Sequence, residues 1–97
     1  MAKYGMLTKG THMKLKNRRF IVYGTKKCEF CAMARELLEE QNIAFDVINF
    51  DSRPKILKEI KQVYDWKTVP MIFEKLEDSS FKLVGGYTDL LNYLGGE

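Results

Sequence analysis

Two cysteines separated by two residues are the part of this sequence best suited to chemistry. They are Cys28 and Cys31, in the tetrapeptide Cys28-Glu29-Phe30-Cys31. The pair follows an apolar run at 20–23 and precedes a strongly helical segment, so we place it at a strand-to-helix junction. A helix N-terminus directs free N–H groups and the positive end of its dipole at the first sulfur, which favours thiolate over thiol. The spacing therefore predicts thiol–disulfide chemistry or metal binding.

The elements that must position these cysteines alternate between strand and helix patterns. Apolar runs predict strands at 20–23, 45–50, 71–73 and 81–84, and residues 24–27 read as a loop. Helical spacing predicts helices over 32–41, from Pro54 onward, and from Tyr87 or Thr88 to the last leucines, with Asn42 ending the first. The order β-α-β-α-β-β-α predicts an α/β fold: a right-handed parallel crossover, then an antiparallel hairpin, in a four-stranded mixed sheet flanked by helices.

The second predicted helix carries an apolar stripe that we interpret as ordinary core. The stripe consists of Ile56, Leu57, Ile60, Val63 and Tyr64. We expect it to pack on one face of the sheet and to carry no chemistry.

Length and composition limit the class of protein. The 97 residues, 45% hydrophobic and 30% charged, predict one globular domain. No run of about 18 apolar residues is present, which excludes a transmembrane helix. The first twenty residues contain several lysines and no continuous apolar core, so we expect no secretory signal. Two cysteines without such a signal indicate a reducing compartment, and we expect a cytoplasmic protein.

Positive charge is concentrated at the N-terminus. Residues 1–19 carry six lysines or arginines and no acid, a charge of +6, so the remainder carries 3 − 6 = −3. Such an arm can contact nucleic acid, an anionic membrane or an acidic partner, but a solvated extension is the common alternative. Aromatic residues do not alternate with the basic ones as in a stacking surface. We expect residues 1–18 to form a basic, disordered extension without a nucleic-acid or membrane partner, and residues 19–97 to form the domain.

Four segments in register resemble the glutaredoxins, a family of the thioredoxin superfamily. They are Cys28-x-x-Cys31 after the first strand, Thr68-Val69-Pro70 before the third, Gly85-Gly86 after the fourth, and Thr88-Asp89 opening the last helix. The resemblance covers about residues 19–94. A Cys-x-x-Cys alone is a weak signal, whereas its combination with the other three segments is specific. The resemblance implies a thioredoxin-like fold and glutathione-dependent reduction of disulfides.

The resemblance also implies a glutathione site. Val69-Pro70 would be a cis peptide bond that brings the Val69 backbone beside the sulfurs, where it would pair with the cysteine unit of glutathione. Gly85-Gly86 would allow close approach of a ligand, and Thr88 and Asp89 would meet the γ-glutamyl unit, although either residue could simply cap the helix. The further contacts that the resemblance implies are Phe30, Thr68, Lys67 at the glycine carboxylate, and Lys26 or Lys27 as the second basic contact.

The chain departs from the family pattern at two positions. The basic residue that usually stands three positions before the first cysteine is replaced by Thr25, which is why Lys26 and Lys27 are considered. Glu29 stands where the familiar Cys-Pro-Tyr-Cys has proline, and Phe30 keeps the aromatic ring without the hydroxyl. The Glu29 charge opposes thiolate formation at Cys28, while the lysines and the helix end favour it.

The resemblance implies that Cys28 attacks as thiolate and that Cys31 resolves the mixed disulfide. The substrates would be disulfide-bonded or glutathionylated proteins, with glutathione as co-substrate. One alternative is a glutaredoxin-like redoxin that donates electrons to ribonucleotide reductase and is recharged by thioredoxin reductase. Another is an iron–sulfur carrier, but two cysteines cannot complete a four-ligand site, so a cluster would need a dimer with bound glutathione. His12 is the single histidine and lies in the tail, and we expect no metal site.

Overall fold

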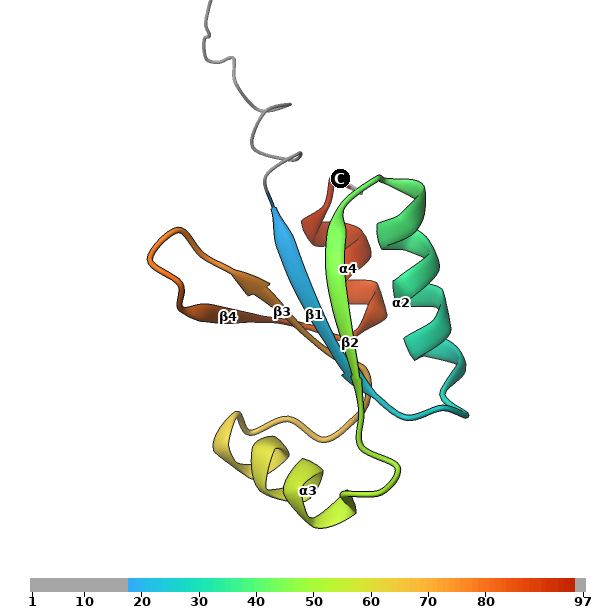
Figure 1. Ribbon diagram of the computed structural model, residues 1–97, viewed down its shortest axis with the longest axis vertical. Helices are drawn as coiled ribbons and strands as arrows, with labels where there is room; N and C mark the ends of the chain where they lie inside the picture. Colours follow the sequence, from blue (N-terminus) through green and yellow to red (C-terminus); the bar gives the residue numbers. More distant parts are fainter. Residues whose placement is uncertain (1–17, 96–97) are drawn as a thin grey trace, which may run out of the picture.

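The computed structural model describes residues 18–95 (Figure 1). Its elements are β1 (Arg19–Gly24), α2 (Glu29–Glu40), β2 (Ala44–Asn49), α3 (Pro54–Val63), β3 (Met71–Lys75), β4 (Phe81–Gly85) and α4 (Tyr87–Tyr93). The predicted order of strands and helices is confirmed. Asn42 follows α2 with φ 58°, a left-handed conformation that asparagine tolerates, and it ends the helix as expected. None of the helices within 18–95 combines the length and hydropathy needed to cross a membrane.

The four strands form one mixed sheet in the order β2-β1-β3-β4. β1 pairs parallel with β2, and the other two neighbouring pairs are antiparallel. The helix α2 makes the crossover between the parallel strands, as the sequence predicts. β1 is a central strand, so the cysteine segment that follows its C-terminal end lies near the middle of one end of the sheet (Figure 1).

Two apolar clusters, one on each face of the sheet, join the helices to it. On one face, α2 and α4 contribute Ala34, Leu38 and Leu90, which pack against Phe20 and Ile72 of the sheet. On the other face, α3 contributes Leu57, which clusters with Phe50, Met71 and Phe73. Successive residues of β3 therefore belong to different clusters, because side chains along a strand point alternately to the two faces of the sheet.

The apolar stripe of α3 is buried much less than the sequence predicts. Leu57 is the buried residue of this helix, whereas Ile56, Tyr64 and Val63 are 45%, 42% and 77% exposed. The prediction that these three residues are core is wrong. The physical reason is that α3 lies at one end of the sheet rather than along it, so only a narrow strip of the helix meets other elements (Figure 1).

Arg18 belongs to the folded part of the chain. Its Nε and Nη2 atoms donate to the Glu74 carboxylate at 2.6 and 3.0 Å, and the Tyr93 hydroxyl donates to the same carboxylate at 2.6 Å. Glu74 is 7% exposed, so these partners compensate a buried charge. Residues 1–17 of the expected extension lie outside the described residues, and Arg18 falls one residue before the expected domain boundary.

Glu74 should make the stability of the protein depend on pH. Burial alone would raise the pKa of Glu74, but hydrogen bonds from Arg18 and Tyr93 outweigh it and hold this pKa below its usual value. A lowered pKa gives stability that is present above the unfolded-state value and is lost as pH falls through the folded-state value. Glu74→Gln should therefore lower the free energy of unfolding by about 2 kcal/mol at pH 7, and by much less well below about pH 4.

Denaturant unfolding of the wild type and the variant at both pH values measures this difference. The exposed residue Glu36 provides a matched control, since Glu36→Gln should change stability by less than about 0.5 kcal/mol. An equal loss for Glu74→Gln at neutral and acid pH would contradict the assigned role of its charge.

Candidate active site

Cys28 caps the N-terminus of α2. Its backbone is extended, with φ −81° and ψ 114°, and its Sγ accepts the backbone N–H of Cys31 at 3.1 Å. This hydrogen bond gives a partner to one of the free N–H groups of the helix end and stabilises negative charge on the sulfur. The Cys28 side chain is half-buried, so a disulfide can reach it. Glu29, the acid in the first turn, is exposed.

Cys31 faces the interior and packs against Gly24, the last residue of β1. It is reduced, as is Cys28, and only 1% exposed. A Cβ atom on Gly24 would lie 2.5 Å from the Cys31 Sγ and 3.2 Å from its Cβ. Only glycine therefore lets α2 approach β1 with the sulfur between them. The sequence predicts a loop at Gly24, whereas the structure places it at the end of β1; a glycine next to an apolar run and shortly before the cysteines is the signal that indicates this role.

The surroundings of Cys31 keep it protonated. Burial, followed by the hydrogen bond with the Cys28 sulfur, raises the pKa of Cys31 to about 12. A hydrogen bond with the Thr25 backbone and the charge of Arg35 lower it only in part. At neutral pH Cys31 is therefore a thiol, and the two sulfurs differ in both exposure and hydrogen bonding.

The loop before β3 lies beside Cys28. The Val69-Pro70 peptide bond is cis, as the family resemblance implies. The Val69 carbonyl oxygen is 3.7 Å from the Cys28 Sγ, although 41 residues separate them in the chain. On the other side of this loop, the position of a Cβ on Gly86 is 3.8 Å from the Pro70 carbonyl oxygen. The loop thus connects the reactive sulfur to the start of α4.

The start of α4 closes this side of the site. Gly85 has φ 130°, a conformation that favours glycine, and a Cβ there would collide with the Asp89 carboxylate. Asp89 accepts the Gly86 N–H at 2.9 Å and therefore caps the helix, the simpler of its two expected roles. The Phe30 ring lies 6.3 Å from the ring of Tyr87, between centroids. Tyr87 is absent from the predicted site residues, although its place between Gly-Gly and Thr-Asp is a usable signal.

Five other predicted site residues make no hydrogen bond to either cysteine. They are Lys26, Lys27, Lys67, Thr68 and Thr88, and all five are exposed. The Lys26 backbone N–H donates to both Asp51 carboxylate oxygens at 3.1 and 3.3 Å, so an unpredicted acid anchors the loop before α2. In the part of the chain from 18 to 95, no three His, Cys, Asp or Glu side chains gather as a metal site.

Comparisons with known proteins agree with this geometry. The family model described as Glutaredoxin matches residues 20–76. A glutaredoxin of Neisseria meningitidis serogroup B is 36% identical over 64 residues, which is 65% of this chain and 69% of that protein. A glutaredoxin-like protein NrdH of Lactococcus lactis is 33% identical over 53% of this chain and 69% of its own length. The crystal structure of Francisella tularensis glutaredoxin 1 complexed with cacodylate superimposes with a TM-score of 0.64 and 29% identity, over 81% of this chain and 94% of that one.

Selective alkylation tests the difference between the two thiols. Iodoacetamide reacts with thiolates, and at pH 8 a thiol with a pKa of about 12 is ionised in only about one molecule in ten thousand. We expect the folded protein to acquire one adduct, on Cys28, as read by mass spectrometry of its peptides.

Unfolding the protein in guanidinium chloride provides the control, since both cysteines should then react. Modification of Cys31 in the folded protein at a rate comparable to Cys28 would show that Cys31 is neither buried nor protonated as described.

Proposed function

The chain belongs to the glutaredoxin family, and on that premise we propose that it is a glutathione-dependent thiol–disulfide oxidoreductase acting through Cys28 and Cys31. Its substrates are glutathionylated and disulfide-bonded proteins. The observation that carries the proposal is the inequality of the two sulfurs. Cys28 is accessible and accepts a helix N–H, whereas Cys31 is 1% exposed and protonated. The first is therefore the nucleophile and the second the resolving residue.

The reduction of a glutathione mixed disulfide needs Cys28 alone. The Cys28 thiolate attacks the glutathione sulfur, an S–S bond forms between them, and the substrate leaves as a thiolate that takes up a proton. The thiolate of a second glutathione then attacks the Cys28-bound sulfur and releases glutathione disulfide. The Cys28 thiolate is the leaving group of this second exchange, so the net reaction converts the mixed disulfide and one free glutathione into the substrate thiol and glutathione disulfide.

The reduction of a protein disulfide needs both cysteines. After Cys28 has formed a mixed disulfide with the substrate, Cys31 loses its proton and attacks the Cys28 sulfur. The second substrate thiolate leaves and is protonated, and a Cys28–Cys31 disulfide remains, which two glutathione molecules reduce. In the mixed disulfide, the Cys28 sulfur is bonded to the substrate. Its hydrogen bond and its charge then no longer raise the pKa of Cys31, and burial is the main remaining cause.

The surroundings of Cys28 support glutathione as the co-substrate. The Val69 carbonyl beside the sulfur can pair with the cysteine unit of an extended ligand, as in an added strand. The Gly86 position lies 3.8 Å from the carbonyl oxygen of the next residue, Pro70, and Asp89 accepts the Gly86 N–H, so we assign the γ-glutamyl unit to this helix start. We assign the remaining contacts to Lys26, Lys27, Phe30, Lys67, Thr68, Gly85 and Thr88 as proposals. The cell compartment that fits this chemistry is the cytoplasm.

A second candidate function is a redoxin recharged by thioredoxin reductase. The similarity to the Lactococcus lactis glutaredoxin-like protein NrdH, 33% identical over 51 residues, favours it. Ribonucleotide reductase would then be the electron acceptor. The same two cysteines would perform the dithiol route, and only the source of electrons would differ.

Replacement of each cysteine separates their roles. With a glutathionylated peptide as substrate, Cys28→Ser should lower kcat/KM at least about 100-fold, because the covalent nucleophile is lost. Cys31→Ser should retain turnover, because the monothiol route does not use that sulfur. The coupled oxidation of NADPH by glutathione reductase reports the glutathione disulfide formed. Retained activity in Cys28→Ser would disprove the mechanism.

The electron donor distinguishes the two candidate functions. We expect the oxidised protein, with its Cys28–Cys31 disulfide, to be reduced faster by glutathione than by thioredoxin reductase with NADPH, since the Gly86 position lies 3.8 Å from the Pro70 carbonyl oxygen, beside the proposed ligand backbone. The Cys31→Ser variant is the control, because it cannot form that disulfide. Faster reduction by thioredoxin reductase would favour the redoxin.

A further inference from the structure

The strand β2 forms one edge of the sheet and leaves one side of its backbone unpaired. In the described part of the chain, the strand order gives it a single neighbour, β1. The Phe50 N–H donates to the Gly24 carbonyl oxygen at 2.9 Å, so this N–H points toward β1. Backbone groups of successive residues point in opposite directions along a strand, so the N–H and C=O groups of Phe45, Val47 and Asn49 point away from the sheet. A second strand can therefore bind along this edge.

The β2 edge lacks the features that usually prevent such pairing. It contains no lysine, proline or glycine, and its register with β1 is regular. Its one charged residue, Asp46, is already bound by Arg19 at 2.9 and 3.0 Å. Val47 and Ile48 are apolar and 36% and 39% exposed. The opposite edge, β4, differs, because it contains a lysine and a glycine and its register with β3 is irregular.

The outward groups of β2 are self-complementary in an antiparallel pairing. They are symmetric about Val47, because Phe45 and Asn49 lie two residues before and two residues after it. A twofold axis at Val47 therefore pairs Val47 with its own copy and Phe45 with Asn49, and each pair exchanges both backbone hydrogen bonds. The two Val47 side chains then lie side by side on one face of the sheet. Such a pairing forms about six hydrogen bonds and joins two sheets into one.

The two ends of β2 carry opposite charge. Glu39 and Glu40 end α2 shortly before β2 begins, and the last turn of α2 contains no basic residue. At its other end, β2 leads to Asp51, whose carboxylate holds the backbone of Lys26 at 3.1 and 3.3 Å. Lys27 follows on the same loop and is exposed. An antiparallel pairing brings the acidic end of each copy to the basic end of the other, whereas a parallel pairing would bring like charges together.

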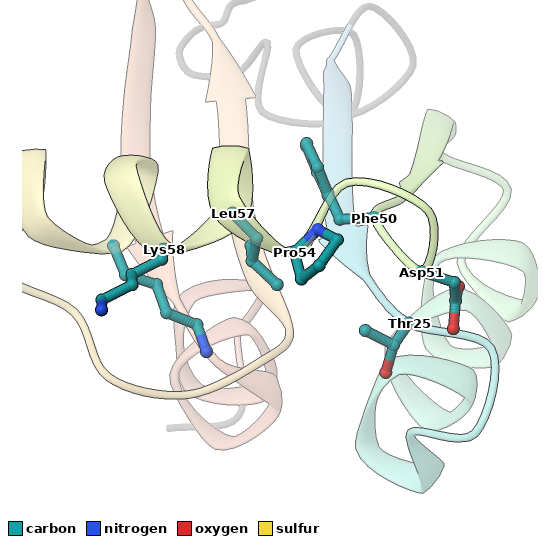
Figure 2. A pocket seen from close by; sticks show the side chains of 7 residues that line it. Thr25, Phe50, Asp51, Pro54, Leu57 and Lys58 are labelled. Atoms are coloured by element: carbon teal, nitrogen blue, oxygen red, sulfur yellow. The ribbon is translucent and has the colours of Figure 1, made fainter.

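The helix that follows β2 adds positive charge to the basic end. Figure 2 shows Thr25 and Asp51 on one side of a recess of about 410 Å³ and Lys58 on the other. Lys61 also lines this recess, so its two lysines outnumber its one carboxylate. Arg53 is exposed just before α3, and the first turn of that helix contains no acidic residue. The region after β2 is therefore positively charged, in contrast to the end of α2 that precedes the strand.

We infer that the edge of β2 binds β2 of a second copy of this chain, antiparallel and with a twofold axis at Val47. Self-complementary backbone groups, an apolar side chain on the axis and unlike charges at the two ends favour a second copy over a strand of arbitrary sequence. The cysteine segments of the two copies then lie at opposite ends of the joined sheet, because each follows the C-terminal end of its own β1. The contact uses neither cysteine and does not depend on the proposed chemistry.

The mass of the full chain in solution tests this contact. With reductant and low salt, we expect analytical ultracentrifugation to give twice 11.3 kDa at about 0.2 mM protein, a high concentration because an interface built on one strand pair is small. Sodium chloride should weaken the dimer, since exposed charges contribute to it. Val47→Lys should weaken it at least about tenfold, because two lysines would then meet on the axis. Val47→Pro should do the same, because it removes an outward N–H and leaves the bonds to β1 intact.

Charge exchange tests the role of the two ends of β2. Glu39→Lys/Glu40→Lys should weaken the dimer about three- to tenfold, the effect of a few exposed ion pairs. Adding Lys26→Glu/Lys27→Glu to the same chain should restore it. Phe81→Lys is the matched control, because it changes an exposed apolar residue on the opposite edge, β4, and should leave the dimer intact. Far-UV circular dichroism verifies that each variant is folded.

Disulfide trapping tests the register. In the Cys28→Ser/Cys31→Ser background, Val47→Cys places two cysteines opposite each other on the axis, with Cα atoms about 5.5 Å apart, a separation that suits a disulfide. Air and copper phenanthroline should convert this variant to a covalent dimer. Asn49→Cys lies on the same strand and the same face, but it is paired with the partner's Phe45 and should be trapped at least about tenfold more slowly.

A wild-type mass near 11.3 kDa at about 0.2 mM, a Val47→Lys variant that still dimerises, or equal trapping at positions 47 and 49 would overturn the inference. Assemblies larger than the dimer would indicate general aggregation of the edge and overturn it too. A monomer whose Val47 N–H is protected from hydrogen exchange would show that another segment of the same chain covers the edge, which would also overturn it. Each of these results leaves the proposed chemistry of Cys28 unaffected.

Discussion

The close packing of the Cys31 sulfur against Gly24 is the contact on which the site depends. Gly24 ends the central strand β1, and a side chain there would occupy the space of the sulfur. The contact fixes the distance between α2 and β1, and the Cys31 side chain is buried between them. Cys28, three residues earlier, is consequently left at the helix end, where its Sγ accepts an N–H and faces the loop of Val69. A backbone constraint in the core thus determines which of the two sulfurs is accessible.

Burial rather than residue type makes the two cysteines different. Both are thiols of the same chemistry, yet one caps a helix and the other lies in the core at 1% exposure. The raised pKa of Cys31 keeps it from competing as a nucleophile in the resting protein. In the mechanism that we propose, the Cys28 sulfur becomes bonded to the substrate, so its contributions to the raised pKa of Cys31 are then removed.

Much of the fold could be predicted from the sequence, because its signals are local. Apolar runs and helical spacing located the elements, and Asn42 marked the end of α2. The apolar stripe of α3 predicts a buried helix face, but most of that face is exposed. Periodicity shows which residues share a face, not how much of that face another element covers. The pairing of Arg18 with Glu74 joins residues 56 positions apart, and no local pattern indicates it. Gly24 gave a signal in the sequence, but its reason appears only when α2 is packed on β1.

The same distinction applies to the departures from the family pattern near Cys28. The sequence shows Thr25 where a basic residue is usual, and it offers the neighbouring lysines as replacements. In the folded chain, Lys26 is exposed and its backbone is bound to Asp51, while Thr25 lines a recess whose positive charge comes from α3. Lys58 and Lys61 stand some thirty residues after Cys28 in the sequence. No local pattern brings Thr25 and these two lysines together, because the recess that they line forms only when α3 lies beside the loop before α2.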